Sequence, residues 1–292
     1  MAIQTAFLHV VPQKPADLAL VRASIRQISD WRKLLTKKGR REAGQVLLEG
    51  ARLVGEAVVS DVEVSAVVVA DVEHGHRDLR KLLTAVNRRS APIFAVPPRD
   101  FEKLTDTVHA SGIACVIKWN PRRFNPTEVS QGLRRVLICD RIADPGNLGT
   151  LIRTAAGLGM DAVFLLPETA ELSNPKTVRA AAGAFFHIPV YEDVAPQRII
   201  SWARQASITI FVADAHRGES VALVAPKHWA LVVGGETIQL DKAWESSASR
   251  WISLPLHRGV ESLNAAVAGA IIMDRLCHAS ERPPSRGRQQ RS

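Results

Sequence analysis

Arg153 is the only charged residue between Gly146 and Met160. A turn is expected at Pro145 and Gly146, and a helix from about Thr150. The polar residues of this helix recur at i, i+3, i+4 and i+7, and are Thr150, Arg153, Thr154 and Gly157. A guanidinium in this place can bind a phosphate or stabilise negative charge that develops on an oxygen atom. A solvated surface position is the alternative interpretation.

Two further segments end a predicted strand in glycine and polar residues. Leu231–Glu236 is an apolar strand that ends in two glycines and Glu236. Ser253–Ile271 predicts a strand, a loop and a helix whose first turn carries Glu261, Ser262 and Asn264, with Ser262 as the expected N-cap. Open α/β sheets bind ligands beyond the carboxyl ends of their strands. The three segments therefore predict one shared pocket.

The second half of the chain predicts an open, mostly parallel α/β sheet. Near-continuous apolar runs are typical of strands covered on both faces, and they occur at residues 135–140, 162–166, 208–214, 230–235 and 251–256. The last helix is expected over residues 261–278, with Leu263, Val267, Ile271 and Ala270 on its buried side.

The first half predicts a smaller α/β domain over residues 29–119, in which strands and helices alternate. Residues 1–28 are expected to be an N-terminal extension. Residues 120–132 contain two prolines and many polar residues, and are expected to be a linker. The second domain is expected over residues 133–280, and residues 281–292 as a disordered basic tail.

Composition narrows the class of protein. The 38 Lys and Arg residues exceed the 29 Asp and Glu residues, and the net charge of +9 favours a polyanionic partner such as nucleic acid. Cys115, Cys139 and Cys277 are far apart and have no zinc-ligand spacing, so we expect reduced thiols and no metal. Without a signal sequence or an apolar run of about 20 residues, a cytoplasmic protein with no membrane partner is expected.

A basic segment precedes the first predicted strand of the smaller domain. Its cations are Arg32, Lys33, Lys37, Lys38, Arg40 and Arg41. They are expected to hold structured RNA through its phosphates. A solvated helix face is the alternative interpretation of the same residues.

The three strand ends together resemble the SpoU class of the SPOUT RNA ribose 2'-O-methyltransferases. The first motif of that family, N-x-G-x-x-x-R, matches Asn147, Gly149 and Arg153; the second, a strand that ends in glycine and glutamate, matches Gly234 and Glu236. The third matches Pro255, Gly259, Ser262, Leu263 and Asn264. The resemblance covers roughly residues 30–280, and its first part is similar to the family's RNA substrate-binding domain.

The resemblance implies a trefoil knot in the second domain and S-adenosylmethionine as the cofactor. It places the adenine of the cofactor against the backbone at Gly234, Leu254 and Leu263, with Leu231, Gly235 and Gly259 as further binding positions. It also implies a homodimer, in which Arg153 can act across the interface. Of the catalytic residues it implies, Arg153 holds the RNA phosphate and stabilises developing alkoxide charge, because a guanidinium is a poor base. Asn147, Glu236, Ser262 and Asn264 orient Arg153 and the ribose.

The resemblance therefore implies an enzyme that methylates a ribose 2'-hydroxyl, with large-subunit ribosomal RNA as the expected substrate and transfer RNA as the alternative. The sequence departs from the family pattern at Gly235 and Gln239. This departure leaves open a catalytically inactive RNA-binding ribosome assembly factor. A nucleotide-dependent oxidoreductase is excluded because the G-x-G-x-x-G fingerprint is missing.

Overall fold

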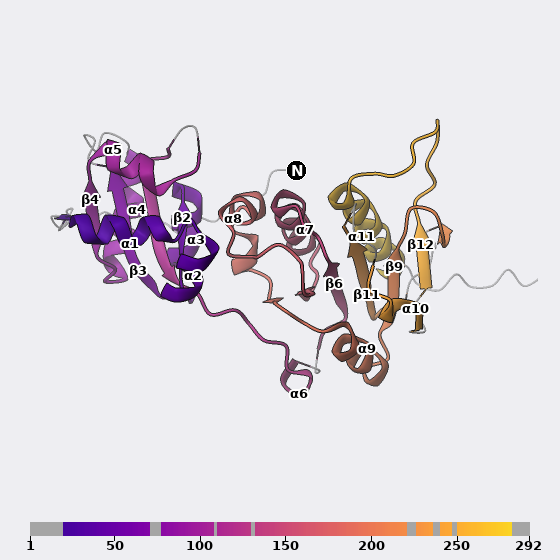
Figure 1. Cartoon of the computed structure of the whole chain (residues 1–292). Coiled ribbons are helices and arrows are strands. Elements are labelled where there is room, and N and C mark those ends of the chain that lie inside the picture. The colour runs from indigo at the N-terminus through magenta and orange to yellow at the C-terminus, as the bar shows by residue number, and fades with distance from the viewer. Residues whose placement is uncertain are drawn as a thin grey trace, which may run out of the picture. The chain divides into compact units, whose positions relative to one another are not determined.

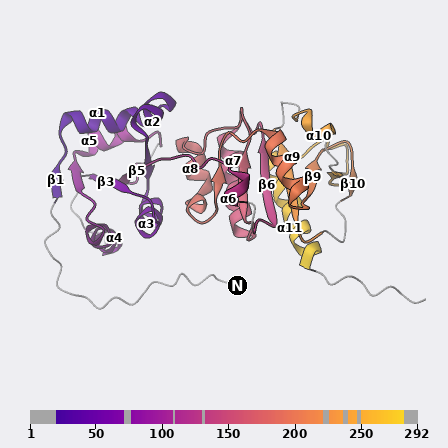
Figure 2. The ribbon, with the colours of Figure 1, turned by 90° about the horizontal axis from the view of Figure 1, so that it is seen from below.

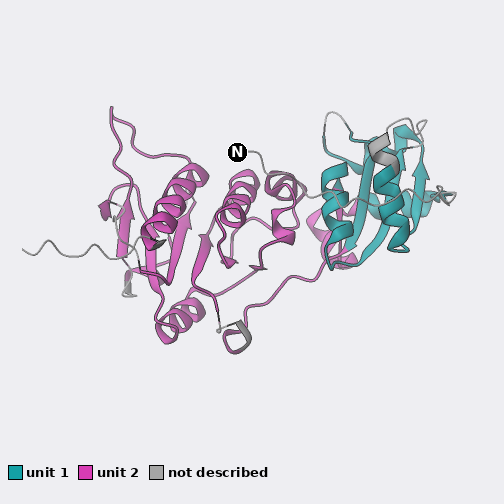
Figure 3. Ribbon diagram, turned by 180° about the vertical axis from the view of Figure 1, so that it is seen from behind, with its two compact units in different colours: residues 1–32, 49–117 teal, residues 33–48, 118–292 magenta. Residues whose placement is uncertain are grey.

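The computed structural model describes residues 20–70, 77–107, 110–129, 132–220, 226–235, 240–246 and 250–281 (Figures 1 and 2). The chain divides into two compact units, one of residues 1–32 and 49–117, the other of residues 33–48 and 118–292 (Figure 3). By this division residues 33–48, which lie inside the predicted domain of residues 29–119, group with the second unit. The predicted tail lies outside the described residues, apart from Glu281.

A five-stranded mixed sheet, most of which belongs to the first unit, confirms the predicted smaller α/β fold. Its strands, in spatial order, are β1 (Leu20–Arg22), β4 (Ile93–Val96), β3 (Val64–Ala70), β5 (Ile113–Lys118) and β2 (Gln45–Glu49). β3 is parallel to β4 and antiparallel to β5. β1 was not expected, because residues 20–22 fall in the predicted extension, yet it pairs in parallel with β4.

Short helices connect the strands of this sheet. They are α1 (Ile25–Lys33), α2 (Lys37–Ala43), α3 (Ala51–Val59), α4 (Arg77–Arg88), α5 (Pro98–Phe101) and the 3-10 turn η1 (Glu102–Leu104). α3 buries Leu53, Val54, Ala57 and Val58, as the helical spacing of these residues predicts.

The second unit contains a seven-stranded sheet in which every described pairing is parallel, which confirms the predicted fold class. Its strands, in spatial order, are β10 (Glu219–Ser220), β12 (Arg250–Ser253), β9 (Thr209–Ala213), β11 (Trp229–Gly234), β6 (Arg135–Asp140), β7 (Ala162–Leu165) and β8 (Val190–Tyr191). The carboxyl ends of β6 and β11 lie side by side, because Gly234 is in register with Asp140.

Helices cover both faces of this sheet (Figure 2). One face packs against α7 (Pro145–Gly157), α8 (Pro175–Ala181), η2 (Ala184–Phe186) and α11 (Ala265–Glu281). The other packs against α9 (Pro196–Gln205) and α10 (Ala243–Ser246). Successive β6 residues alternate between the two cores, with Leu137 in the first and Ile138 in the second. No helix in the described residues is long and apolar enough to cross a membrane.

The predicted linker contains a helical turn and a residue that is buried in the second unit. It contains the short helix α6 (Pro126–Val129), and Phe124 is buried in the second core. The Phe124 ring lies 4.7 Å from the ring of Phe164 and 5.8 Å from that of Trp202. Aromatic contacts of this kind hold Phe124, and with it the first part of the predicted linker, against the second sheet.

The buried face of α11 differs from the predicted one. The helix begins at Ala265, and Val267 is 49% exposed. Its buried face includes Ile272, Met273 and Leu276 instead. The prediction failed here because small and apolar residues occupy almost every position of the helix, so several faces look equally apolar.

Candidate active site

Helix α7 begins five residues earlier than the sequence predicted. Asp144 is its N-cap and accepts a hydrogen bond from the backbone N–H of Asn147 at 2.8 Å, while Pro145 occupies the first helical position. Asn147 and Gly149 are therefore helical residues and not members of a turn. An Asp-Pro pair before an apolar helix is a start signal, and the glycines that follow it masked that signal.

Gly149 allows α7 and α8 to approach each other closely. A Cβ atom at this position would lie 2.5 Å from the carbonyl oxygen of Thr177 and from the Cβ of Ala180. Any side chain would therefore force the two helices apart. This contact fixes the first turn of α7, which carries Asn147, against α8.

The first and third predicted motifs meet through their asparagines. The side-chain amide of Asn264 donates to Oδ1 of Asn147 at 2.9 Å, although the two residues are 117 positions apart. Asn264 Oδ1 also accepts the backbone N–H groups of Ala266 and Val267, so Asn264 caps α11. The predicted cap, Ser262, is exposed and two residues too early. One side chain thus starts a helix and links two motifs.

An ion pair extends this polar chain to α8. Lys176 Nζ lies 2.9 Å from Oδ2 of Asp144. The hydrogen bond from Lys176, followed by that from the backbone of Asn147, lowers the pKa of the Asp144 carboxyl. The starts of α7, α8 and α11 are therefore held together by Asp144, Asn147, Lys176 and Asn264.

Arg153 is exposed on the polar side of α7. The burial of its neighbours agrees with the predicted stripe, because Thr150 and Gly157 are exposed and Leu151 and Ile152 are buried. Arg153 lies six positions after Asn147 in the helix, which is roughly 9 Å along the axis and about 120° around it. Arg153 therefore leaves α7 in a different direction from Asn147.

The strand end of the second motif requires glycine. A Cβ atom at Gly234 would lie 2.5 Å from Cδ2 of Leu240, and one at Gly235 would lie 2.4 Å from the carbonyl oxygen of Arg141. At Gly235 the obstacle is backbone, which leaves no room for a side chain, whereas at Gly234 the side chain of Leu240 would have to shift. Leu231 lies three residues upstream and is fully buried in the sheet. Glu236 and Gln239 lie outside the described residues.

The third motif is a loop that connects β12 to α11. Leu254 and Leu263 are half-buried, and Leu254 packs against the core on the α7 side of the sheet. Gly259 has φ +73°, a left-handed conformation that glycine adopts readily. Glu261 and Ser262 are exposed. The loop thus combines an anchored start with a polar, accessible end.

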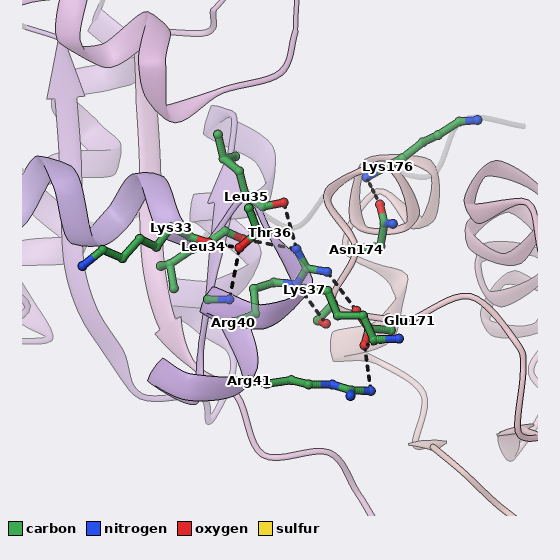
Figure 4. A network of polar contacts seen from close by, with 12 residues as sticks. Lys33, Leu34, Leu35, Thr36, Lys37, Arg40, Arg41, Glu171, Asn174 and Lys176 are labelled. Carbon is green, nitrogen blue, oxygen red and sulfur yellow. Dashed lines mark hydrogen bonds and ion pairs between the residues drawn. The ribbon is translucent and has the colours of Figure 1, made fainter.

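The basic segment contains one buried cation, Arg40, and several exposed ones. Figure 4 shows Arg40, Lys37 and Arg41 around Glu171. Arg40 is only 5% exposed; it donates to Oε2 of Glu171 at 2.9 Å and to Oγ of Ser173 at 3.2 Å. Lys37 and Arg41 pair with the other oxygen of Glu171, both at 3.1 Å, and remain largely exposed. The expectation that Arg40 binds RNA phosphate is therefore wrong, because protein groups already satisfy its guanidinium.

The described residues contain no group of three or more His, Cys, Asp or Glu side chains that could hold a metal ion. The groups near the strand ends are amides, backbone atoms and glycines, together with the ion pairs Asp144–Lys176 and Arg141–Asp241. A few placed polar groups of this kind can orient a small ligand by hydrogen bonding.

Comparisons with known proteins agree with both halves of the chain. Residues 134–274 match the SpoU rRNA Methylase family, and residues 26–115 match the MRM3-like substrate binding domain. The chain is 33% identical over 251 residues to the 23S rRNA (guanosine(2553)-2'-O)-methyltransferase RlmP of Bacillus subtilis, an alignment that covers 86% of this chain and 96% of that protein.

A second relative and a solved structure extend the comparison. The 23S rRNA (uridine(2479)-2'-O)-methyltransferase of Streptomyces viridochromogenes is 27% identical over 85% of this chain and 88% of its own length. The crystal structure of the SpoU methyltransferase AviRb from Streptomyces viridochromogenes, in complex with the cofactor AdoMet, superposes with a TM-score of 0.76 at 26% identity, and covers 87% of this chain and 97% of that one.

Proposed function

The chain belongs to the SpoU rRNA methylase family, and on that basis we propose that it transfers the methyl group of S-adenosylmethionine to a ribose 2'-hydroxyl of large-subunit ribosomal RNA. The observation that carries this proposal is the hydrogen bond between Asn147 and Asn264, which joins the first and third motifs at one point. The relatives that act on 23S rRNA favour ribosomal over transfer RNA. A ribosomal substrate supports a cytoplasmic location.

The backbone at the strand ends suits an adenosyl group. The ends of β6 and β11 lie side by side, and the loop that follows β12 starts from the same edge of the parallel sheet. We assign the cofactor to the backbone around Gly234, Leu254 and Leu263, with Gly235 and Gly259 shaping the loops. When bound, S-adenosylmethionine supplies an electrophilic methyl group on a positively charged sulfur. The trefoil knot that accompanies this family's fold belongs to the same region.

Arg153 is assigned to the RNA. Its exposed guanidinium can bind a phosphate next to the target ribose and stabilise negative charge on the 2'-oxygen as the proton leaves. Asn147 and Asn264 hold the first turns of α7 and α11 in a fixed relation, so that the ribose is aligned. Such alignment can supply on the order of 7–11 kcal/mol of the barrier reduction. Glu236 and Ser262 are assigned to orienting the ribose and Arg153.

A homodimer is the expected assembly. The family resemblance is the basis for this expectation. Val260, in the loop before α11, and Val267, in its first turn, are about half exposed, at 50% and 49%, and we assign them to the surface that meets the second copy. Arg153 leaves α7 about 120° away from Asn147, a direction that supports its action in the site of the partner subunit.

The exposed cations of α2 are assigned to the RNA backbone. The Lys38 side chain is 84% exposed, and its Nζ lies 3.8 Å from Oε1 of Glu42. Lys37 and Arg41 carry two positive charges and share one carboxylate, that of Glu171. Surface ion pairs of this kind give way readily to a phosphate because each contributes little. The proposed RNA contacts are therefore Lys37, Lys38 and Arg41, together with Arg32 and Lys33.

The deciding experiment maps ribose methylation by mass spectrometry in ribosomal and transfer RNA. RNA from cells that lack the chain is compared with RNA from cells that carry wild type, Arg153→Ala or Arg204→Ala. Arg204 is an equally exposed arginine on α9, on the other face of the sheet, and serves as the matched control. One ribosomal position is expected to lose its methyl group in cells that lack the chain and in cells that carry Arg153→Ala. The same position is expected to keep its methyl group with wild type and with Arg204→Ala.

Two other outcomes would redirect the proposal. A lost methyl group in transfer RNA would reassign the substrate. Full methylation by Arg153→Ala would remove Arg153 from the mechanism. Calorimetry on the wild-type protein separates an enzyme from an inactive assembly factor, because only the enzyme is expected to bind S-adenosylmethionine.

A further inference from the structure

Asp140 is a buried carboxylate at the carboxyl end of β6, next to the proposed cofactor site. It is 1% exposed. One of its oxygens, Oδ2, accepts the backbone N–H of Asp241 at 2.7 Å and the indole N–H of Trp244 at 2.8 Å. Trp244 is itself fully buried. The carboxylate therefore fixes the segment that starts at Asp241 to the end of β6.

The backbone of Asp140 contacts the chain on the other side of Glu236. Its carbonyl oxygen accepts the N–H of Gly235 at 3.2 Å. Gly235 directly precedes Glu236, and Asp241 follows five residues after Glu236. Asp140 thus contacts both flanks of residues 236–240.

Arg141 contacts the same two flanks. Its Nη2 lies 3.1 Å from Oδ2 of Asp241, and its carbonyl oxygen packs against Gly235, in the space that a Cβ there would need. Arg141 has φ +53°, a left-handed conformation that is uncommon for a residue with a side chain. The chain therefore turns sharply at this point, which brings the side chain and the carbonyl group of Arg141 to the two flanks.

Burial of this carboxylate is costly. Its second oxygen, Oδ1, has no hydrogen-bond partner in the described part of the chain. A buried acceptor without a partner opposes folding, and an apolar side chain of similar size would avoid that cost. An apolar side chain, however, cannot accept the two N–H groups of Asp241 and Trp244. The presence of Asp140 is thus better explained by the position it gives to Asp241 and Trp244 than by a gain in stability.

We infer that Asp140, together with Arg141, is a positioning residue for cofactor binding. The pair holds Gly235 and Asp241 so that the glycine backbone at the end of β11 keeps the conformation that the adenosyl group contacts. This inference rests on the proposed function, because it assumes that S-adenosylmethionine binds at Gly234 and Gly235. It adds a role for two residues that lie outside the three sequence motifs.

The test compares Asp140→Ala with Asp140→Asn and Ile138→Ala in the full chain. Asn keeps one oxygen that can accept both N–H groups, whereas Ala keeps none. Ile138 lies two residues earlier on the same strand and in the same core as Trp244, so its truncation reports loss of packing alone. For each variant the dissociation constant of S-adenosylmethionine, KM for the cofactor, kcat and the melting temperature are measured.

We expect Asp140→Ala to weaken cofactor binding at least tenfold and to raise KM in proportion, with kcat at saturating cofactor within threefold of wild type. Asp140→Asn is expected to restore binding to within threefold. Ile138→Ala is expected to lower the melting temperature without changing cofactor affinity. Equal affinities for Asp140→Ala and Ile138→Ala would overturn the inference.

Arg141→Gln keeps the test decisive if Asp140→Ala does not fold. The Arg141 side chain is partly exposed, and its loss removes the ion pair to Asp241 and a longer one to Glu168. We expect this variant to weaken cofactor binding at least threefold, and unchanged binding would refute the positioning role. If the wild-type protein itself does not bind S-adenosylmethionine, the proposed function fails instead.

Discussion

The side chain of Asn264 reaches from the start of α11 to Asn147 in the first turn of α7, a distance of 2.9 Å between Nδ2 and Oδ1. The same side chain caps α11 through its oxygen atom. A substitution can separate the link to Asn147 from the cap of α11, because the link uses Nδ2 of Asn264 and the cap uses its Oδ1.

Asn264→Ser is expected to keep the cap and lose the link to Asn147. Serine caps helices about as well as asparagine, but its hydroxyl is too short to reach across. The free energy of unfolding is expected to stay within about 0.5 kcal/mol of wild type, while kcat falls at least tenfold. Denaturant unfolding and a methyl-transfer assay measure the two quantities.

Asn264→Ala serves as the control for that pair of measurements. It loses the cap as well as the link, and should cost roughly 1 kcal/mol of stability in addition. Wild-type kcat in Asn264→Ser would show that the link to Asn147 has no part in catalysis.

Gly149→Ala is expected to destabilise the second unit by roughly 1–3 kcal/mol, because the new methyl group would overlap the backbone of Thr177. Gly157→Ala is the matched control on the same helix, where nothing lies within 4 Å of the added atom. It is expected to be neutral or to stabilise by up to about 1 kcal/mol. Denaturant unfolding of both variants checks the prediction, and equal stabilities would contradict the tight packing of α7 on α8.

Arg40→Ala is expected to cost about 1.5–3 kcal/mol of stability, because Glu171 and Ser173 lose their buried hydrogen-bond donor. Lys37 and Arg41 offset part of this loss, since both also pair with Glu171. Thermal unfolding provides the measurement. A change below about 0.5 kcal/mol would mean that Arg40 contributes no more than a surface cation.

Lys38→Ala is the complementary change on the same helix. Its stability is expected to remain within about 0.5 kcal/mol of wild type. RNA affinity should fall and depend less on salt, with a slope of log K against log salt that is smaller by roughly 0.7–0.9 if one phosphate contact is lost. Filter binding at several salt concentrations measures that slope, and an unchanged slope would exclude Lys38 from the RNA contact.

The three thiols are expected to resist alkylation in the folded protein. Cys115, Cys139 and Cys277 are all buried. Burial raises the pKa of Cys115 to about 12 and also raises that of Cys139, so neither forms thiolate near pH 8. Both are expected to react with iodoacetamide only after denaturation, as counted by mass spectrometry. Rapid labelling of Cys139 at pH 8 would disagree with its place in the core.

The sequence predicted the elements whose signal is local. Apolar runs located β6 and β11 because a strand covered on both faces has hardly any polar residue. Strands of two residues, such as β8, are too short to show a pattern. The start of α7 was placed late because glycines at positions 146 and 149 favour a turn, whereas the helix needs Gly149 for packing against α8.

The candidate site was predicted as a set of residues and not as a geometry. Motif resemblance selected Asn147 and Asn264, but their hydrogen bond joins residues 117 positions apart and no periodicity predicts it. No sequence pattern marks Asp140, because an acid at the end of a strand is usually a surface residue. Only the positions of Asp241 and Trp244 around it reveal what it holds.

The outermost strands of the seven-stranded sheet, β8 and β10, have two residues each. Arg122 forms a parallel bridge to Tyr191 and so occupies part of the β8 border. Long free sheet edges invite lateral pairing between chains, and within the described residues this sheet has very little free edge. Short outer strands of this kind disfavour strand-by-strand aggregation, and they leave the helical surfaces for contacts with other molecules.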